Sequence, residues 1–198
     1  MRSVHRRSSW GASALVLIAG IALVAPASAQ RTPAQLTPTF KDRDRPDGGQ
    51  KTDSTCSVGF AEIVDERRSP ELVGVIGKRS VLAPADSQSW MRAVLRGLNA
   101  RGVKALFDAA GRPGGPTARF VLKTAWVAES VDTYSAVVVV TVQAQGADGR
   151  AVDRTYRGRV ARTAYWSGGV DTMQSAVDGA FADALDAIAA DLKPLCQS

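Results

Sequence analysis

The chain has 198 residues, with 25 Lys or Arg, 19 Asp or Glu, a formal net charge of +6 and one histidine, His5. Residues 1–29 have the pattern of a removable signal, so we predict a mature chain without histidine. A chain that lacks imidazole has no Ser-His-Asp or Cys-His apparatus and no imidazole metal ligand, which excludes most hydrolase mechanisms.

The predicted signal has three parts. The segment MRSVHRRSS is basic, an apolar run follows from about residue 12 to residue 25, and PASAQ offers a cleavage site after Ala29. The apolar run is shorter than the roughly 20 residues of a spanning helix. We therefore expect an exported, soluble chain in the periplasm, with secretion or outer-membrane association as alternatives. The pair Arg6 and Arg7 leaves twin-arginine export open beside the general pathway.

Removal of the signal takes away three arginines and no acidic residue, which lowers the net charge to +3. This balance does not favour nucleic acid as a partner. The next segment, residues 30–55, is polar and contains three prolines. It has too little apolar surface to offset its ordering entropy, so we predict a flexible tether followed by a single α/β domain at residues 56–198.

The domain is predicted to contain strand, helix, three strands and helix, in that order. Residues 56–64 are apolar and β-prone, residues 72–76 and 80–82 fit a small hairpin, and residues 85–102 form a helix with Asp86 or Ser87 as its N-cap. Strands at 118–128, 134–145 and 153–166 are joined by short polar turns, which favours consecutive hairpins. The last helix runs from Val170 to Leu192, with four aspartates facing solvent: Asp178, Asp183, Asp186 and Asp191.

This order predicts an α+β fold, a two-layer β-α-β-β-β-α sandwich with a four-stranded, mostly antiparallel sheet and two helices on one face. Alternation along the strands places Phe120, Leu122, Trp126, Val138, Val140, Val142, Tyr156, Val160, Ala164 and Trp166 under the helices. The matching register pairs Trp126 with Ala136 and Ala136 with Val160. The opposite face is predicted to be uncovered, basic and partly apolar, with Lys123, Val139 and Arg157 side by side.

The stretch EIVDERRSPELVGVIGKR, residues 62–79, is dense in charge. Asp65 and Glu66 are the obvious candidates for an acid–base pair, but neighbouring residues of a strand point to opposite faces. Arg67 and Arg68 would also keep both carboxylates ionised. We therefore interpret the stretch as a structured loop rather than an active site.

Other motifs give no site. The glycines of GVIG and GRPGGP lack the strand-to-helix context of a phosphate loop, and ADGR lacks the ligands of a calcium loop. Trp90, Trp126 and Trp166 fall on the predicted buried face, which favours core over a sugar-binding platform. The arginines of the last strand fit edge protection and anion binding equally well. We predict no catalytic residue, no metal site and no cofactor.

Three segments carry a resemblance to a known family. VDERRSPELVGVIG, SWMRAVLRGLNARGV, and TYRGRVARTAYWSG followed by MQSAVDGAFADALDAIAADL resemble the YajG-type envelope lipoproteins of Gram-negative bacteria and, more distantly, the auxiliary lipoproteins of ABC lipid transporters. The resemblance implies a small periplasmic α/β domain without known catalytic residues. Members carry a lipid-bearing cysteine just after the signal, whereas Ala29 and Gln30 stand at that position here.

The leading hypothesis is a non-catalytic periplasmic or cell-envelope binding or assembly module that contacts an envelope protein or an anionic lipid head group and is peripheral to the membrane at most. Its candidate partner-binding residues are Arg119, Lys123, Arg157, Arg159, Asp65 and Arg67. The alternatives are a secreted effector or inhibitor and a hydrolase that works with carboxylates alone, taken from Asp65, Glu66, Glu129 or Asp132.

Both cysteines, Cys56 and Cys196, lie in the predicted domain, and an even count in an oxidising compartment suggests a disulfide. Topology predicts the same bond. A right-handed crossover makes strand 118–128 parallel to strand 56–64, and two hairpins then reverse the chain twice. The last helix must return to the edge where the first strand begins, which brings the two cysteines to the same end of the domain.

Overall fold

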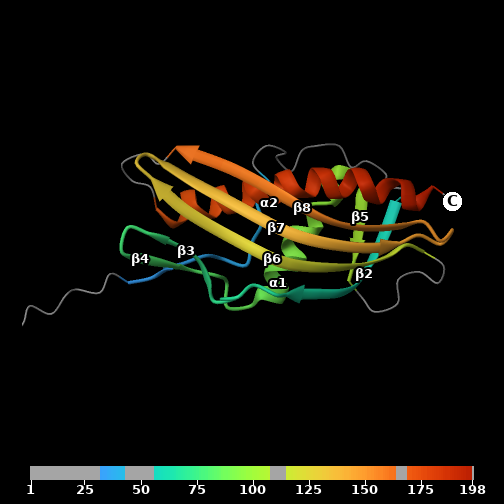
Figure 1. Ribbon diagram of the computed structural model, residues 1–198, viewed down its shortest axis with the longest axis horizontal. Helices are drawn as coiled ribbons and strands as arrows, with labels where there is room; N and C mark the ends of the chain where they lie inside the picture. The colour runs from blue at the N-terminus through green and yellow to red at the C-terminus, as the bar shows by residue number, and fades with distance from the viewer. Residues whose placement is uncertain (1–31, 43–55, 108–114, 164–168, 198) are drawn as a thin grey trace, which may run out of the picture. The chain divides into compact units, whose positions relative to one another are not determined.

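A computed structural model describes residues 32–42, 56–107, 115–163 and 169–197. The predicted signal peptide, residues 43–55 of the predicted tether, and Ala164, Tyr165 and Trp166 lie outside these residues. In the described part, eight strands and two α-helices are present (Figure 1). The strands are β1 (Ala34–Gln35), β2 (Cys56–Asp65), β3 (Leu72–Ile76), β4 (Arg79–Leu82), β5 (Val103–Leu106), β6 (Thr117–Ser130), β7 (Thr133–Gln145) and β8 (Ala151–Thr163). The helices are α1 (Ser87–Arg96) and α2 (Val170–Leu192), with 3-10 turns η1 (Asn99–Arg101) and η2 (Lys193–Cys196).

All eight strands belong to one sheet, and β6 is its central strand. On one side, β6 pairs antiparallel with β7, which pairs antiparallel with β8. On the other side, β6 pairs in parallel with β2 along its first half and with β3 near its end. Strand β5 extends the sheet from β2, and β4 and β1 extend it from β3.

The α+β class, the three long strands, their two hairpins and the parallel crossover are therefore confirmed, but the prediction of a four-stranded sheet is wrong. The missed strands β1 and β5 contain two and four residues, too few for a period of two to stand out. The small hairpin β3–β4 was predicted, but it joins the same sheet through only two residues, Gly74 and Val75, which pair with β6.

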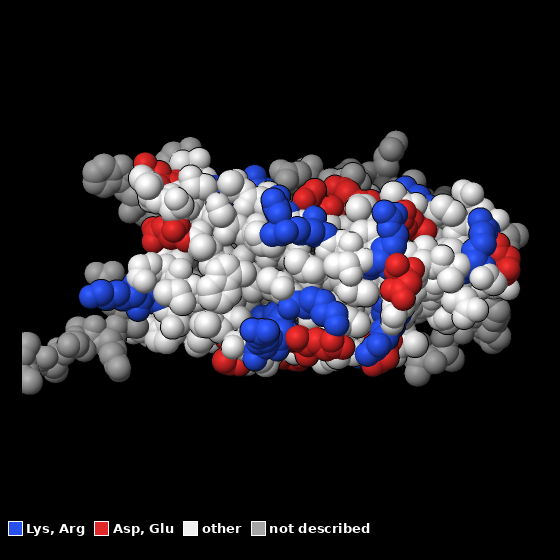
Figure 2. All heavy atoms as spheres, in the orientation of Figure 1, with Lys and Arg blue, Asp and Glu red and all other residues white. Residues whose placement is uncertain are grey.

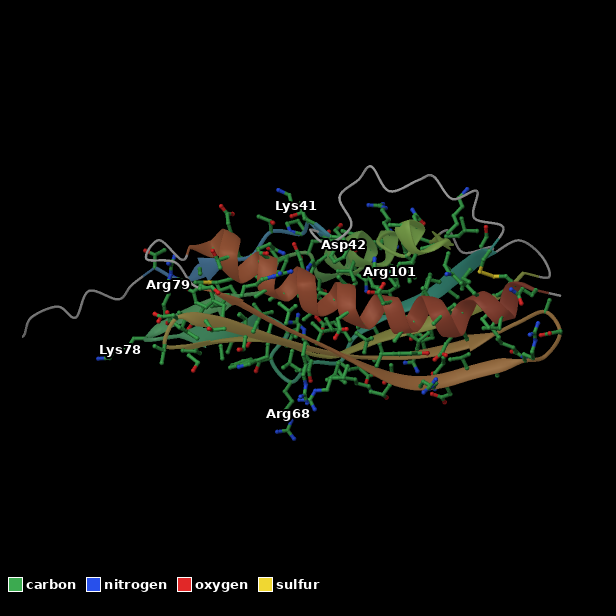
Figure 3. The ribbon with its side chains drawn as sticks, turned by 90° about the horizontal axis from the view of Figure 1, so that it is seen from above. Lys41, Asp42, Arg68, Lys78, Arg79 and Arg101 are labelled. Carbon is green, nitrogen blue, oxygen red and sulfur yellow. A yellow bond between two sulfur atoms is a disulfide. The ribbon has the colours of Figure 1, made fainter. Side chains whose placement is uncertain are left out.

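Both helices lie on the same side of the sheet (Figure 3). Trp90 of α1 and Phe181 of α2 meet edge to face with ring centroids 5.3 Å apart, and both side chains are buried in the core. Asp86 accepts the N–H of Ser89 as the predicted N-cap of α1. The helices thus bury one face of β6, β7 and β8 and leave the opposite face of these three strands, hereafter the open face, uncovered by them.

Residues 32–42 are not a tether. Ala34 and Leu36 are buried in the core, and the backbone N–H groups of Thr37 and Lys41 donate to Gln174 and Asp178 of α2 at 3.0 and 3.2 Å. Asp178, predicted to face solvent, is only 2% exposed because this segment covers it. Composition misled both predictions, since two buried side chains, pairing with β4 and hydrogen bonds to α2 together hold this short segment on the domain.

The buried side chain of Arg101, in η1, connects the same segment to α2. The Arg101 side chain contacts Asp42 at 2.8 Å and Asp186 of α2 at 2.8 Å, and it donates to the carbonyl of Ala182 at 3.0 Å. Arg101 and Asp42 lie together in Figure 3. The end of the N-terminal segment is therefore held against α2 by charge as well as by hydrogen bonds.

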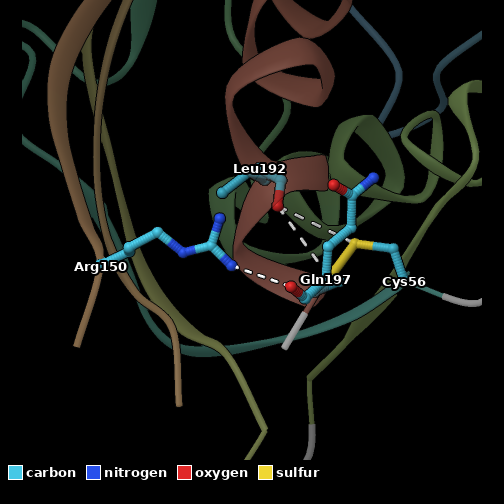
Figure 4. Close-up of a disulfide and its surroundings, with 5 residues drawn as sticks. Cys56, Arg150, Leu192 and Gln197 are labelled. Carbon is cyan, nitrogen blue, oxygen red and sulfur yellow. Dashed lines mark hydrogen bonds between the residues drawn. A yellow bond between two sulfur atoms is a disulfide. The ribbon is translucent and has the colours of Figure 1, made fainter. Parts of the chain in front are cut away.

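The two cysteines form the predicted disulfide. Cys56 begins β2, Cys196 ends η2, and their Cα atoms are 5.2 Å apart across a sequence separation of 140 residues (Figure 4). Arg150, next to the β7–β8 turn, donates to the carbonyl of Gln197 at 3.1 Å beside this bond. The start of β2 and the end of the helical layer are thus joined at one end of the sheet, as the strand directions required.

Candidate functional site

The open face is the candidate site, and a β-bulge in β6 determines which residues it carries. The register of β6 with β7 shifts between Leu122 and Thr124, so Lys123 is an extra residue. Beyond the bulge the alternation is reversed: Ala125 and Val127 are buried, whereas Trp126 is 40% exposed. The predicted burial of Trp126 is therefore wrong, and its cross-strand partner is Val137 rather than Ala136. A bulge of this kind re-aims side chains.

The register of β6 with β7 differs from the prediction at one more pair, because Thr124 rather than Lys123 lies opposite Val139. The register of β7 with β8 agrees with the prediction. Ala136 pairs with Val160, Val139 with Arg157 and Val137 with Arg159. The residues of β7 and β8 predicted for the helix side are also placed correctly where they are described, since Val138, Val140, Val142 and Tyr156 are buried.

Two of the predicted basic residues are neutralised within the chain. Arg119 contacts Glu62 of β2 at 2.9 Å, and Lys123 forms an ion pair and hydrogen bond with Glu66. The hydrogen bond from Lys123, assisted by the charges of Lys123 and Arg119, lowers the pKa of Glu66 below its ordinary value. The predicted repulsion between Lys123 and Arg157 is thus relieved by an internal carboxylate.

At the β2 end of the open face, polar side chains surround a shallow groove of about 520 Å³. Glu62, Arg119, Gln143 and Asp153 form one cross-strand row from β2 to β8, and Gln143 donates to Asp153 at 3.1 Å. Alanines and Val152 line the rest of the groove. Arg119 compensates the charge of Glu62, whereas Asp153 is held by the neutral amide of Gln143, so the row carries one cation and two carboxylates.

The other half of the open face is apolar. Trp126 lies between Val137 of β7 and the β3 strand, where Val75 pairs with Ala128. Among the described residues, the exposed large hydrophobic side chains are Val75 at 42%, Trp126 at 40% and Val131 at 89%, and all three belong to β3 or to the end of β6 and its turn. Figure 2 shows a broad uncharged area over this part, with Lys and Arg along much of its border and Asp or Glu at its left end.

Two arginines at that border differ from Arg119 and Lys123. Arg157 and Arg159 lie on β8, opposite Val139 and Val137, and both are exposed. In the described part of the chain, neither guanidinium forms an ion pair. The positive charge left over on the open face is therefore concentrated on β8, next to the apolar area.

Asp65 and Arg67, two further predicted partner residues, are not on this surface. Arg67 is only 7% exposed; its guanidinium holds Asp65 with two hydrogen bonds of 2.8 and 2.7 Å and donates to the carbonyl of Pro70 at 2.6 Å. It also lies 5.5 Å from the ring centroid of Trp90. Both side chains hold the loop that follows β2 together and lie away from the open face, in agreement with the interpretation of this stretch as a structured loop.

The carboxylates considered for hydrolysis do not form a pair. Asp65 is engaged by Arg67 on the helix side, whereas Glu66 is engaged by Lys123 on the open face, so the two neighbours point apart as predicted. Glu129 and Asp132 are exposed at the β6–β7 turn. The described residues contain no group of three His, Cys, Asp or Glu side chains that would hold a metal ion.

No family model and no curated protein matches this chain. Similar solved structures include a Xanthomonas campestris protein of the DUF330 family, with a TM-score of 0.49, 13% identity and coverage of 84% of this chain and 95% of that one. A lipoprotein from Neisseria meningitidis has a TM-score of 0.32 and 12% identity over 62% of this chain and 94% of its own. A minor lipoprotein from Acinetobacter baumannii has a TM-score of 0.36 and 11% identity over 68% and 94%.

With identities of 13% or less and TM-scores below 0.5, these similarities assign neither a family nor a function to the chain. The resemblance to YajG-type lipoproteins stays a prediction. Within the described residues, no helix is long and apolar enough to cross a membrane.

Sequence reasoning missed the acidic partners of the open face and the exposure of Trp126. Glu62 follows Ala61, where the register of β2 with β6 shifts, so simple alternation along β2 does not predict the face on which Glu62 lies. Both omissions arise from bulges, which a strict period of two cannot represent. The many charged residues in 62–68 indicated that ion pairs form here. Only the pairing of β2 with β6 shows which cations Glu62 and Glu66 contact.

Proposed function

We propose that this chain is a non-catalytic binding or assembly module of the periplasm or cell envelope that contacts its partner through the open face. The observation that carries the proposal is the uncovered surface of β6, β7 and β8, three long strands supported from behind by α2. Regular strands hold such a surface more rigidly than loops. The partner is an envelope protein or an anionic lipid head group.

The electrostatics support a binding role over hydrolysis. General acid catalysis needs a carboxyl group whose pKa is raised toward neutrality. Three carboxyl groups of the described residues are shifted the other way: hydrogen bonds from Lys123, Ser89 and the backbone of Arg150 lower the pKa of Glu66, Asp86 and Asp148, respectively. These residues are suited to stay ionised and to orient neighbours.

The experiment is site-specific photo-cross-linking in intact cells. A photoreactive residue at Thr155 or Ser135 on the open face should give a discrete adduct, whereas the same residue at Ala187, on the exposed side of α2, should not. Adducts from α2 alone would contradict the proposal. In parallel, turnover of glycans or peptides by the purified protein, abolished in Asp65→Ala, would replace it with the carboxylate-only hydrolase.

A further inference from the structure

The apolar half of the open face combines an exposed aromatic ring with two arginines, Arg157 and Arg159, whose side chains form no ion pair within the described residues. Trp126 and Val137 are cross-strand neighbours, and Arg159 follows in the same row. The adjacent row contains Thr124, Val139 and Arg157. This arrangement, the Trp126 patch, is defined by Trp126, Val137, Val139, Arg157 and Arg159.

The exposure of the ring is built into the fold. Without the extra residue Lys123, Trp126 would share the buried side of β6 with Phe120 and Leu122. Instead, the bulge turns a large aromatic side chain out onto a surface that already carries Val137 and Val139. Exposed apolar patches rimmed by polar groups mark interaction sites, and tryptophan and arginine are the side chains that dominate binding energy in such sites.

The distribution of charge selects the chemistry of the partner. Glu62 and Glu66 lie on the β2 side of the open face and neutralise Arg119 and Lys123, and Asp153 of β8 accepts from Gln143 in the row of Glu62. Arg157 and Arg159 are left for an external anion. Arg68 projects from the same side of the sheet in Figure 3, from the loop that runs beside the β6 bulge. The patch therefore has cations along two borders and an apolar centre.

Resting on the proposed function, we propose that the Trp126 patch binds a segment of a partner protein that carries an apolar or aromatic side chain flanked by carboxylates. The apolar side chain packs on Trp126 and Val137, and the carboxylates accept charge-assisted hydrogen bonds from Arg157 and Arg159, geometries for which a guanidinium is well suited.

Two other occupants fit less well. In a dimer formed through this patch, the unpaired Arg157 and Arg159 of both copies would meet in one interface, which like charges disfavour. A flat anionic membrane would cover the whole face and meet its carboxylates, Glu62, Glu66 and Asp153, as well as its arginines. A narrow acidic segment reaches the patch without touching the acidic half of the face.

The test places a photoreactive phenylalanine at Trp126 of the full chain in intact cells, with the same residue at Thr155 as a control on the same face, and maps the cross-linked peptide by mass spectrometry. We expect position 126 to capture one protein segment with at least two Asp or Glu near the attachment point. If position 155 gives adducts and position 126 gives none, the proposed function stands and this inference fails. Adducts from neither position contradict both.

The captured segment is then synthesised and its affinity for the purified chain is measured. Trp126→Ala and the double variant Arg157→Gln/Arg159→Gln should each weaken binding at least tenfold, since each removes a desolvated anchor or two charge-assisted bonds. The charge-matched control Lys104→Gln/Lys193→Gln, which removes two exposed cations elsewhere, should stay within twofold. Equal loss in the control, capture of phospholipid or of a second copy, or a segment without carboxylates overturns the inference.

Discussion

At Gly158 of β8 the sheet lies directly against the backbone of α2, and the replacement of this glycine by alanine is a direct test of the architecture. A Cβ atom at this position would lie 1.8 Å from the carbonyl oxygen of Ala180 and 2.9 Å from the backbone N of Ala184, both in α2. Ordinary contact begins at 3.4 Å. The opposing atoms are helix backbone, so no side-chain rotation relieves the clash.

The magnitude follows from the displacement required. For the carbon–oxygen contact to become ordinary, α2 must retreat locally by about 1.5 Å, and a gap of about 1 Å already forfeits up to half of each dispersion contact around it. Overpacking of this kind costs about 1–3 kcal/mol, and the rigid backbone places Gly158→Ala at the upper end. Reduced entropy of the unfolded chain returns about 0.5–1 kcal/mol. We expect a net loss of about 2 kcal/mol, or roughly 5–8 °C in Tm.

The assay is equilibrium unfolding in urea with the disulfide intact, comparing midpoints at an unchanged slope. The control is Ala161→Val, three residues after Gly158 and on the exposed face of the same strand. This variant should change the free energy of unfolding by less than about 0.5 kcal/mol. If Gly158→Ala is as stable as the parent protein or more stable, α2 does not approach β8 as described, and the support of the open face from behind must be reconsidered.

Three further predictions address other contacts. The double variant Cys56→Ser/Cys196→Ser should lose about 2–5 kcal/mol of the free energy of unfolding, measured by urea titration of the oxidised parent and the variant, because it releases a constraint across 140 residues. Arg101→Met should lower the free energy of unfolding by about 3 kcal/mol in the same titration, because it removes the cation that faces the buried carboxylate of Asp42. The half-exposed carboxylate of Asp186 can be hydrated instead. Lys123→Gln should raise the pKa of Glu66, which is measured by NMR titration. In the parent protein this pKa is lowered, so the ion pair contributes to the free energy of unfolding above about pH 4.5, and the contribution is lost as the pH falls through the lowered pKa. A Glu66 pKa that does not move in the variant would contradict this pairing.

The parts of the fold that sequence reasoning predicted well depend on regular periods. The last helix was placed at Val170–Leu192 because its apolar residues repeat over six turns, and the hairpin β7–β8 was placed because a short polar connection joins two strand-like segments. The disulfide followed from these elements, because strand directions and one handedness rule determine which ends meet. None of these inferences required knowledge of individual side-chain contacts.

The parts that could not be predicted depend on single contacts or single residues. Residues 32–42 are held by hydrogen bonds to Gln174 and Asp178, and no local pattern indicates that a polar segment has buried partners more than 130 positions away. The ion pairs of the open face depend on the parallel pairing of β2 with β6, which is non-local in the same sense. Composition alone therefore overestimated both the length of the tether and the free charge of the sheet.

The bulge at Lys123 links these observations to function. The inserted residue turns Trp126 outward and so makes one half of the open face apolar, while the pairing of β2 with β6 brings Glu62 and Glu66 to Arg119 and Lys123 in the other half. A regular β6 would have buried the tryptophan and left the open face without an aromatic side chain beside Val137. The observed face instead separates an apolar area, with arginines at its border, from a polar row that contains more carboxylates than cations. Such a division discriminates among partners by shape and by charge together, as specific protein interfaces do.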